Sequence, residues 1–311
     1  MSLKTKELTQ VTANSLEPLM AAEARLWLEK LGWDYSQTQE YIKTYIDLSL
    51  LPGLVLLDGD RPVAYAYMVL DDNRAVIGNI FALPSEWEKG YEVVLAETLT
   101  GVLENSRTIH RVEAQIILFY NVDIDSAFRS AGYSIYERSF LTLDLHSWNG
   151  VRPKPDGVYL AKWRDSMIPE ASELIYESYR GGIDASFSTS FSRRDKCEQF
   201  VYNLVRRSGC GVFLPSVTTV AFDEGGKMAG VVIASRLAKN SGHLPQISVL
   251  PSLHGTGIGA YLVFESLRHF QKAGYDKVSL TVTKLNEKAD SWYRRIGFEQ
   301  TLSFNAYLWE R

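Results

Sequence analysis

The chain has 311 residues, of which 46% are hydrophobic and 23% charged, a composition typical of a folded protein rather than a disordered one. This length is about twice that of a common domain and therefore predicts two domains. The formal net charge of −4 gives no overall attraction to nucleic acid or to an anionic membrane, so neither is expected as a partner.

The two cysteines, Cys197 and Cys210, are too few and too oddly spaced for a disulfide framework or a zinc site. We therefore expect two free thiols and no bound metal. The N-terminus lacks a basic stretch followed by an apolar run, and no segment approaches the roughly 20 apolar residues needed to span a bilayer. These features predict a cytoplasmic protein, either a monomer or a homodimer.

The first half of the chain predicts strands and helices in alternation. Turn-forming residues at 58–62 suggest a hairpin between two strands. The expected elements are strands at 55–57, 63–70 and 76–82, a helix at 92–104 and a strand at 112–119.

Residues 146–157 are the most linker-like stretch. They contain two prolines and two glycines, which disfavour both a helix and a central strand. We therefore place a first domain at residues 1–148, a linker at 149–157 and a second domain at 158–311.

The second half predicts a longer series of elements, beginning with a strand at 158–162 and helices at 168–179 and 193–207. Apolar residues at helical spacing support the second helix. The remaining elements are strands at 218–223, 230–237 and 244–250, a helix at 258–273, a strand at 277–282, a helix at 287–295 and a strand at 299–309. Both halves are thus expected to be α+β domains, each a mostly antiparallel mixed sheet flanked by helices.

The two halves also resemble each other in sequence. Leu83-Pro84-Ser85 matches Leu250-Pro251-Ser252, and residues 126–133 mirror residues 291–298. At one constant separation, Phe128 aligns with Tyr293 and Asn121 with Asn286. Two copies of one template explain these matches best.

A glycine loop lies between the strand at 244–250 and the helix that follows it. Gly255, Gly257 and Gly259 alternate, which lets the backbone N–H groups approach a ligand, and the helix N-terminus adds its positive dipole. Such a loop can bind a pyrophosphate. It is neither a Walker loop, because Ala260 and not Lys follows Gly259, nor a dinucleotide fingerprint, which requires an early βαβ unit. A glycine-rich turn without a ligand remains open.

Residues 249–259 resemble the acyl-CoA loop of the GNAT acyltransferase family. Residues 286–298 resemble its second signature, in which Asn286, Ala289 and Tyr293 are followed by a basic residue and Gly-Phe. Both motifs occur in the family's order and approximate spacing. His254 departs from the pattern, since the family usually has Arg or Gln there; a neutral His can still donate one hydrogen bond, so phosphate binding should weaken rather than vanish.

The resemblance implies two GNAT-like domains in tandem, with acetyl-CoA as cosubstrate and an active site in the C-terminal domain. The activity it implies is N-acetylation of a primary amine on a small molecule or a peptide. The residues implied in acetyl-CoA binding are Val249, His254, Gly255, Thr256, Gly257, Ile258, Gly259, Ala260, Asn286 and Tyr293.

The family mechanism assigns three of these residues a role. Backbone N–H groups near Val249, on a strand that splays from its neighbour, would polarise the thioester carbonyl. Tyr293 would protonate the departing thiolate, and Asn286 would bond the pantetheine arm. Asn286 as a helix cap and Tyr293 as a core aromatic remain alternatives.

The acceptor side carries weaker signals. His243 is the first candidate for the general base, with Asp184 and a water chain as the alternative. Asp184 could also hold a substrate ammonium and Arg180 a substrate carboxylate. A surface His and a solvated loop without a role remain equally open.

The first half repeats the order of elements but lacks the residues that the proposed chemistry needs. Glu86, Glu88 and Glu92 stand in its counterpart of the glycine loop and would repel a pyrophosphate, and Phe128 lacks the hydroxyl of Tyr293. We therefore expect a degenerate N-terminal domain. The alternative function is a non-catalytic acyl-CoA-binding sensor or scaffold protein.

Overall fold

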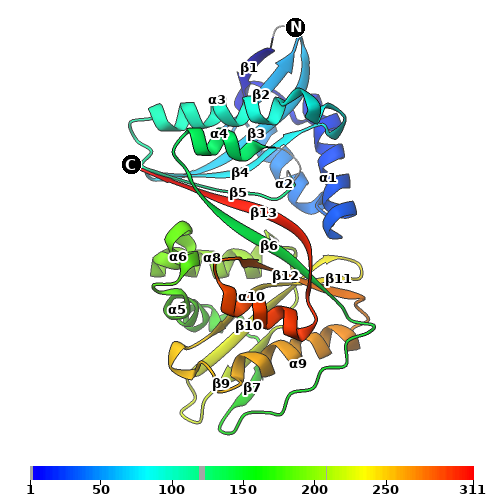
Figure 1. Cartoon of the computed structure of the whole chain (residues 1–311), viewed down its shortest axis with the longest axis vertical. Coiled ribbons are helices and arrows are strands. Elements are labelled where there is room, and N and C mark those ends of the chain that lie inside the picture. Colours follow the sequence, from blue (N-terminus) through cyan, green and yellow to red (C-terminus); the bar gives the residue numbers. More distant parts are fainter. Residues whose placement is uncertain (1–2, 119–122, 208) are drawn as a thin grey trace. The chain divides into compact units, whose positions relative to one another are not determined.

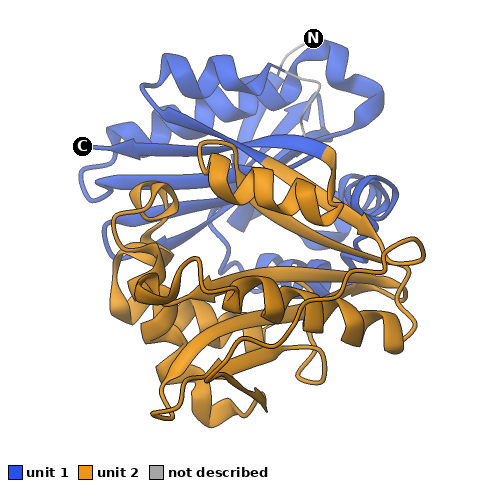
Figure 2. Cartoon of the chain, turned by 60° about the horizontal axis from the view of Figure 1, so that its bottom comes forward, with its two compact units in different colours: residues 1–138, 302–311 blue, residues 139–301 orange. Residues whose placement is uncertain are grey.

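The computed structural model describes residues 3–118, 123–207 and 209–311, and the chain forms two compact units (Figure 2). Unit 1 comprises residues 1–138 and 302–311, and unit 2 comprises residues 139–301. This division differs from the predicted domain limits in two places. The last strand of the chain lies in unit 1, and residues 139–148 lie in unit 2.

Unit 1 contains a mixed sheet in the strand order β1, β2, β3, β4, β5, β13. Its neighbours pair antiparallel except for β4 and β5, which are parallel. The elements are β1 (Leu3–Glu7), α1 (Glu17–Leu31), α2 (Ser36–Asp47), β2 (Gly53–Asp58), β3 (Arg61–Asp71), β4 (Arg74–Ala82), α3 (Tyr91–Asn105), β5 (Arg111–Ile116), α4 (Ile124–Ser130) and β13 (Glu299–Glu310).

In unit 2 the strand order is β6, β12, β11, β10, β9, β7, with β8 paired to β10, and the pairing is again mixed. Its strands are β6 (Ser134–Asp144), β7 (Tyr159–Lys162), β8 (Val212–Phe213), β9 (Thr219–Phe222), β10 (Met228–Ala238), β11 (Ser241–Val249) and β12 (Lys277–Thr283). Its helices are α5 (Ile168–Tyr179), α6 (Ile183–Phe187), α7 (Thr189–Ser192), α8 (Arg194–Arg206), α9 (Ile258–Lys272) and α10 (Glu287–Ile296).

Helices cover both faces of the sheet in unit 2 (Figure 1). Side chains alternate along β10, because successive residues of a strand point to opposite faces. Val232 packs in one apolar cluster with α9 and α10, whereas Val231 and Ile233 pack in another with α5 and α8. The expectation of a mixed, mostly antiparallel sheet flanked by helices is confirmed.

The two units repeat one order of pairings, and the predicted tandem repeat is confirmed. Strands β2 to β5 and strands β9 to β12 each form two antiparallel pairs followed by a parallel one. Helix α3 follows β4 as α9 follows β11. Asn121, the predicted counterpart of Asn286, lies outside the described residues.

Each sheet is closed by a strand from the other half of the chain. Strand β13 pairs antiparallel with β5 in unit 1, and β6 neighbours β12 in unit 2. The sequence predicts β13 but neither β6 nor this exchange of strands, because hydrophobic alternation says nothing about the partner of a strand.

Within the described ranges, no helix is both long enough and apolar enough to cross a membrane. Cys197 and Cys210 are both free thiols, as predicted.

Candidate functional site

Unit 2 contains a cavity of about 510 Å³ between the end of β11, the start of α9 and the inner face of α10. This volume is in the range of small-molecule sites in proteins. The lining residues are Arg152, Ile247, Ser248, Val249, Leu253, His254, Gly255, Gly257, Gly259, Ala260, Asn286, Lys288, Ala289, Trp292, Tyr293 and Arg295.

Strands β11 and β12 diverge on the side of this cavity. Their parallel pairing runs only from Ser241 to His243 on β11, although β11 continues to Val249. The N–H of Leu250 bonds to Ala229 O on the β10 side. Because successive N–H groups of a strand point to opposite edges, the N–H of Val249 points into the opening between β11 and β12. The predicted splayed strand is therefore present, with a backbone donor at its end.

The glycine loop leads from β11 into α9. Gly255 and Gly257 have φ values of +82° and +91°, which residues other than glycine rarely adopt. Gly257 is the N-cap of α9, and the first intrahelical bond runs from Tyr261 N to its carbonyl. The N–H groups at the start of the helix are thus free of helical partners and can bind an anion together with the helix dipole.

Most of the predicted cofactor-binding residues line the cavity, and two do not. Thr256 Oγ1 donates to Leu253 O at 2.8 Å, which stabilises the loop itself. The side chain of Ile258 is buried in the core beneath α9. These two residues contribute backbone groups at most.

His254 is turned back onto its own loop. Its Nε2 lies 3.1 Å from Val249 O. A carbonyl only accepts, so the ring must carry its proton on Nε2, and the neutral imidazole then has no N–H left for a phosphate. The expectation that His254 donates one hydrogen bond to a ligand is therefore corrected: that bond is already made within the loop.

Asn286 begins α10 on the opposite wall. Its side chain accepts from Ala289 N at 3.3 Å, so the predicted N-cap is present. Because Oδ1 accepts this bond, the Nδ2 amide is left as a donor in a residue that also lines the cavity. Capping and ligand binding are thus compatible.

Tyr293 lies two turns further along α10, buried but lining the cavity. Its ring packs edge-on against Phe298 at 6.0 Å. Burial, together with the nearby Tyr179 and Asp184, raises the pKa of the Tyr293 hydroxyl well above its usual value. The hydroxyl is therefore protonated at neutral pH.

Asp184 is brought to this region by the short helix α6. It is buried, and Thr283 Oγ1 donates to its Oδ1 at 2.7 Å from the end of β12. Asp184 does not line the cavity, but it lies near enough to Tyr293 to contribute to the raised pKa of that hydroxyl. From the sequence alone, Asp184 was a loop residue with two possible roles, as an alternative base or as a ligand of a substrate ammonium.

Two other predicted residues lie elsewhere. His243 is buried six residues before Val249 on β11, roughly 20 Å away at strand spacing, and its Nδ1 lies 2.9 Å from Ser279 Oγ. Arg180 is exposed and pairs with Glu177 at 3.4 Å. Because His243 is far from Val249 and the Arg180 guanidinium is already paired, we no longer assign His243 as the base or Arg180 as a substrate ligand.

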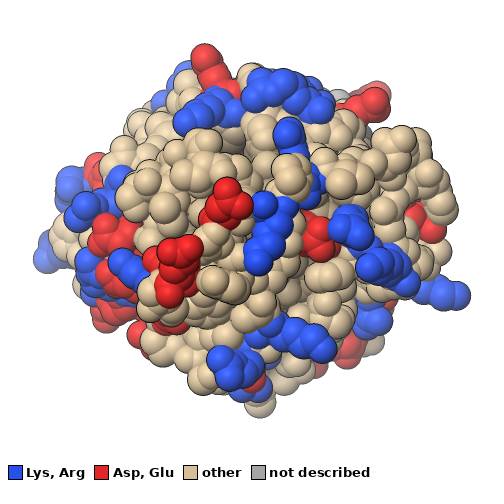
Figure 3. Space-filling view, turned by 90° about the horizontal axis from the view of Figure 1, so that it is seen from below, with Lys and Arg blue, Asp and Glu red and all other residues tan. Residues whose placement is uncertain are grey.

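Three cations line the cavity that the sequence did not single out: Arg152, Lys288 and Arg295. The lining residues include no Asp or Glu, and none of the three cations pairs with an acid among the described residues. This is notable in an acidic chain whose visible surface mixes both signs (Figure 3). The cavity therefore favours an anionic ligand.

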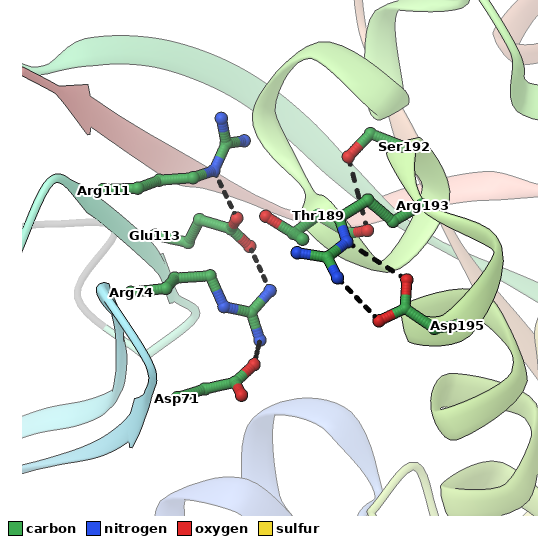
Figure 4. A network of polar contacts seen from close by, with 8 residues as sticks. All are labelled: Asp71, Arg74, Arg111, Glu113, Thr189, Ser192, Arg193 and Asp195. Carbon is green, nitrogen blue, oxygen red and sulfur yellow. Dashed lines mark hydrogen bonds and ion pairs between the residues drawn. The ribbon is translucent and has the colours of Figure 1, made fainter.

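Several arginines away from the cavity are paired with acids (Figure 4). In unit 1, Arg74 and Arg111 bind Glu113 at 3.6 and 2.6 Å. In unit 2, Arg193 makes two bonds to Asp195, at 3.1 and 2.8 Å. These pairs show the partner that the three cations of the cavity lack within the described part of the chain.

The counterpart of the glycine loop in unit 1 is closed by its own side chains. Helix α3 also follows a glycine of positive φ, Gly90 at +65°, but its second residue is Glu92 where α9 has Gly259. The Glu92 carboxyl is buried and accepts no hydrogen bond from another described residue, and burial raises its pKa. A buried carboxyl in the first turn of α3 therefore takes the position that a glycine leaves open in α9.

The sequence model of the acetyltransferase (GNAT) family matches residues 174–298. A 70-residue stretch is 37% identical to a mycothiol acetyltransferase of Frankia casuarinae, covering 22% of this chain and 20% of that protein. A stretch of 135 residues is 27% identical to an uncharacterised N-acetyltransferase of Methanocaldococcus jannaschii, covering 41% of this chain and 54% of that protein. The chain thus matches about a fifth and about half the length of these relatives.

Among solved structures, a tandem GNAT protein from the clavulanic acid biosynthesis pathway superposes with a TM-score of 0.61. The match covers 99% of this chain and 98% of that one at 16% identity. At this identity the likeness concerns the fold, and it extends over both units.

Proposed function

We propose that this chain, which matches the sequence model of the acetyltransferase (GNAT) family over residues 174–298, transfers an acetyl group from acetyl-CoA to a primary amine of a small molecule or a peptide. The reaction takes place in the cavity of unit 2. The observation that carries the proposal is the joint placement of the glycine loop, Val249 and Tyr293 around one cavity that holds three unpaired cations.

Acetyl-CoA is proposed to bind with its pyrophosphate at the N-terminus of α9. The N–H groups of the loop from Gly255 to Ala260 would bond the phosphate oxygens, and the cations of the cavity would neutralise their charge. The pantetheine arm then runs along β11, with the Nδ2 of Asn286 as a donor to its amides. This leaves the thioester in the opening between β11 and β12.

The transfer itself needs an oxyanion donor and a proton donor. When the amine nitrogen attacks the thioester carbonyl, the carbonyl oxygen becomes an oxyanion that the N–H of Val249 can stabilise. The C–S bond then breaks, and Tyr293 gives its proton to the departing thiolate. The attacking amine loses one proton before attack and a second as the amide forms; one of these returns the phenol to its neutral form and the other is released to water.

Asp184 is proposed to hold the acceptor amine. Its buried carboxyl group, to which Thr283 donates, attracts an ammonium group, accepts the proton that the amine loses before attack and passes this proton on to water. This combines the two roles that the sequence left open for the residue. The acceptor class is therefore a cationic amine.

The test is Tyr293→Phe, with Tyr275→Phe as a matched control that loses a hydroxyl beside Phe270, outside the cavity lining. Thiol release would be followed with acetyl-CoA and a panel of diamines, amino sugars and peptide amines. We expect kcat of Tyr293→Phe to fall about 100-fold or more, the usual effect of losing a general acid, while CoA affinity changes little.

An unchanged kcat would refute the acid role of Tyr293. CoA binding without thiol release across the whole panel would instead support the alternative, a non-catalytic acyl-CoA sensor. The absence of any heat on mixing with CoA would reject both functions.

A further inference from the structure

The segment between β6 and β7 is packed onto α9 and is not a free linker. Gln271 Nε2 donates to both Leu145 O and Trp148 O, each at 2.7 Å. The indole of Trp148 is buried edge-on against Phe264 at 5.2 Å. The path of residues 145–150 along α9 is therefore fixed by hydrogen bonds and by aromatic packing.

This packing sets the position of Arg152. A Cβ at Gly150 would lie 2.6 Å from the Phe264 ring and 2.7 Å from Trp148, so only glycine lets the segment come this close. Two residues on, the Arg152 guanidinium lies over the same ring, with Cζ 5.4 Å from its centroid. A guanidinium that contacts a ring through its face keeps its edge N–H donors free.

Arg295 reaches the same region from the end of α10. It lines the cavity together with Arg152, and it also borders a second hollow of about 550 Å³ that contains Phe264. Phe264 is six residues beyond Ile258, so this region lies about 9 Å along α9 from the glycine loop. The hollow also carries Asp144 and Glu299, whereas the cavity side of Arg295 carries no carboxylate.

We propose that Arg152 and Arg295 form a clamp for the ribose 3′-phosphate of CoA. The inference rests on the proposed function, and it assigns the third phosphate of the cosubstrate rather than the pyrophosphate. The pyrophosphate is served by the backbone N–H groups of the loop, whereas a phosphomonoester carries nearly two charges and requires side-chain cations. Arg152 and Arg295 meet this requirement, because both line the cavity beyond the loop and no Asp or Glu is among the described residues of its lining.

The experiment compares the affinities of CoA and 3′-dephospho-CoA by calorimetry at fixed, low ionic strength, since exposed charges are screened by salt. We expect the full chain to bind CoA about 10- to 100-fold more tightly than 3′-dephospho-CoA, because this is the affinity that charge-assisted hydrogen bonds to one phosphate contribute. In Arg152→Ala, and further in the double variant with Arg295→Ala, this ratio should fall toward 1 while the affinity for 3′-dephospho-CoA is kept.

Lys154→Ala is the matched control, because Lys154 belongs to the same segment but lies over the Tyr159 ring, outside the cavity lining. It should keep the wild-type ratio. Equal affinities of the full chain for the two ligands would overturn the clamp and leave the proposed function standing. An equal loss for both ligands in Arg152→Ala would place the arginine on the pyrophosphate and also overturn it. Failure to bind either ligand would reject the proposed function itself.

Discussion

Glu23 in unit 1 provides a test of the structure that does not depend on the proposed activity. Its carboxyl is fully buried on α1 and accepts hydrogen bonds from Trp27 Nε1 at 3.1 Å, from Asn79 Nδ2 at 2.7 Å and from the hydroxyl of Tyr65. Burial raises the pKa of Glu23 to about 7, and the bonds from Tyr65 and Trp27 offset this only in part. The perturbation is Glu23→Gln, which removes the titration and keeps the shape.

The sign and size follow from the two pKa values. Between pH 4.5 and 7 the folded state keeps the proton of Glu23 while the unfolded state has released it. The protonated carboxyl therefore contributes stability that is fully present below pH 4.5 and is lost as the pH rises through 7. At 1.36 kcal/mol per pKa unit, the difference amounts to about 3 kcal/mol.

The assay is urea denaturation from pH 4.5 to 8, followed by tryptophan fluorescence. The free energy of unfolding of Glu23→Gln, relative to wild type, should rise by about 3 kcal/mol over this range. Glu29→Gln, which changes an exposed residue of the same helix, should parallel the wild type. Parallel curves for Glu23→Gln and wild type would refute a buried, protonated Glu23.

Three further predictions concern the glycine loop and the thiols. Gly257→Ala, at φ +91°, should weaken CoA binding, whereas Gly226→Ala, at φ +77° in the turn between β9 and β10, carries a similar backbone strain and should leave CoA affinity unchanged in calorimetry. His254→Arg should tighten CoA binding severalfold because it supplies the donors that the histidine spends on Val249 O, and weaker or equal binding would contradict this reading. In the native protein, iodoacetamide should modify the partly exposed Cys210 and spare Cys197, whose pKa burial raises to about 12; mass spectrometry showing faster modification of Cys197 would be the contrary result.

The fold was largely predictable because its signals are local. Periodic apolar residues gave the helices α5, α8 and α9 and the strands of both hairpins within a residue or two. The short helices α6 and α7 were missed, because one or two turns leave no period to detect. The helices α1 and α2 and the strands β1, β6 and β8 were not predicted either. The exchange of β6 and β13 was missed for another reason, since the partner of a strand is a tertiary choice.

Residues of the candidate site were predicted correctly only where they belong to one contiguous sequence motif. The loop from Gly255 to Ala260 and the helix with Asn286 and Tyr293 are each contiguous, so their order alone brought them together. Arg152 was not found, because it reaches the cavity only through the packing of Trp148 on α9. His243 failed for the opposite reason: it is close in sequence to the loop but faces Ser279 inside the sheet.

The two units show that the backbone geometry of an anion site can be present without the side chains that the proposed reaction requires. In both, a glycine of positive φ precedes a 15-residue helix, so the backbone that could bind a phosphate is retained. The second helical residue differs between them: α9 has Gly259, which has no side chain, whereas α3 has Glu92, whose carboxyl is buried. Replacing Glu92 by glycine would remove this carboxyl from the first turn, where the helix dipole favours an anion. It would not restore chemistry, because the buried Phe128 still offers no proton where unit 2 has Tyr293.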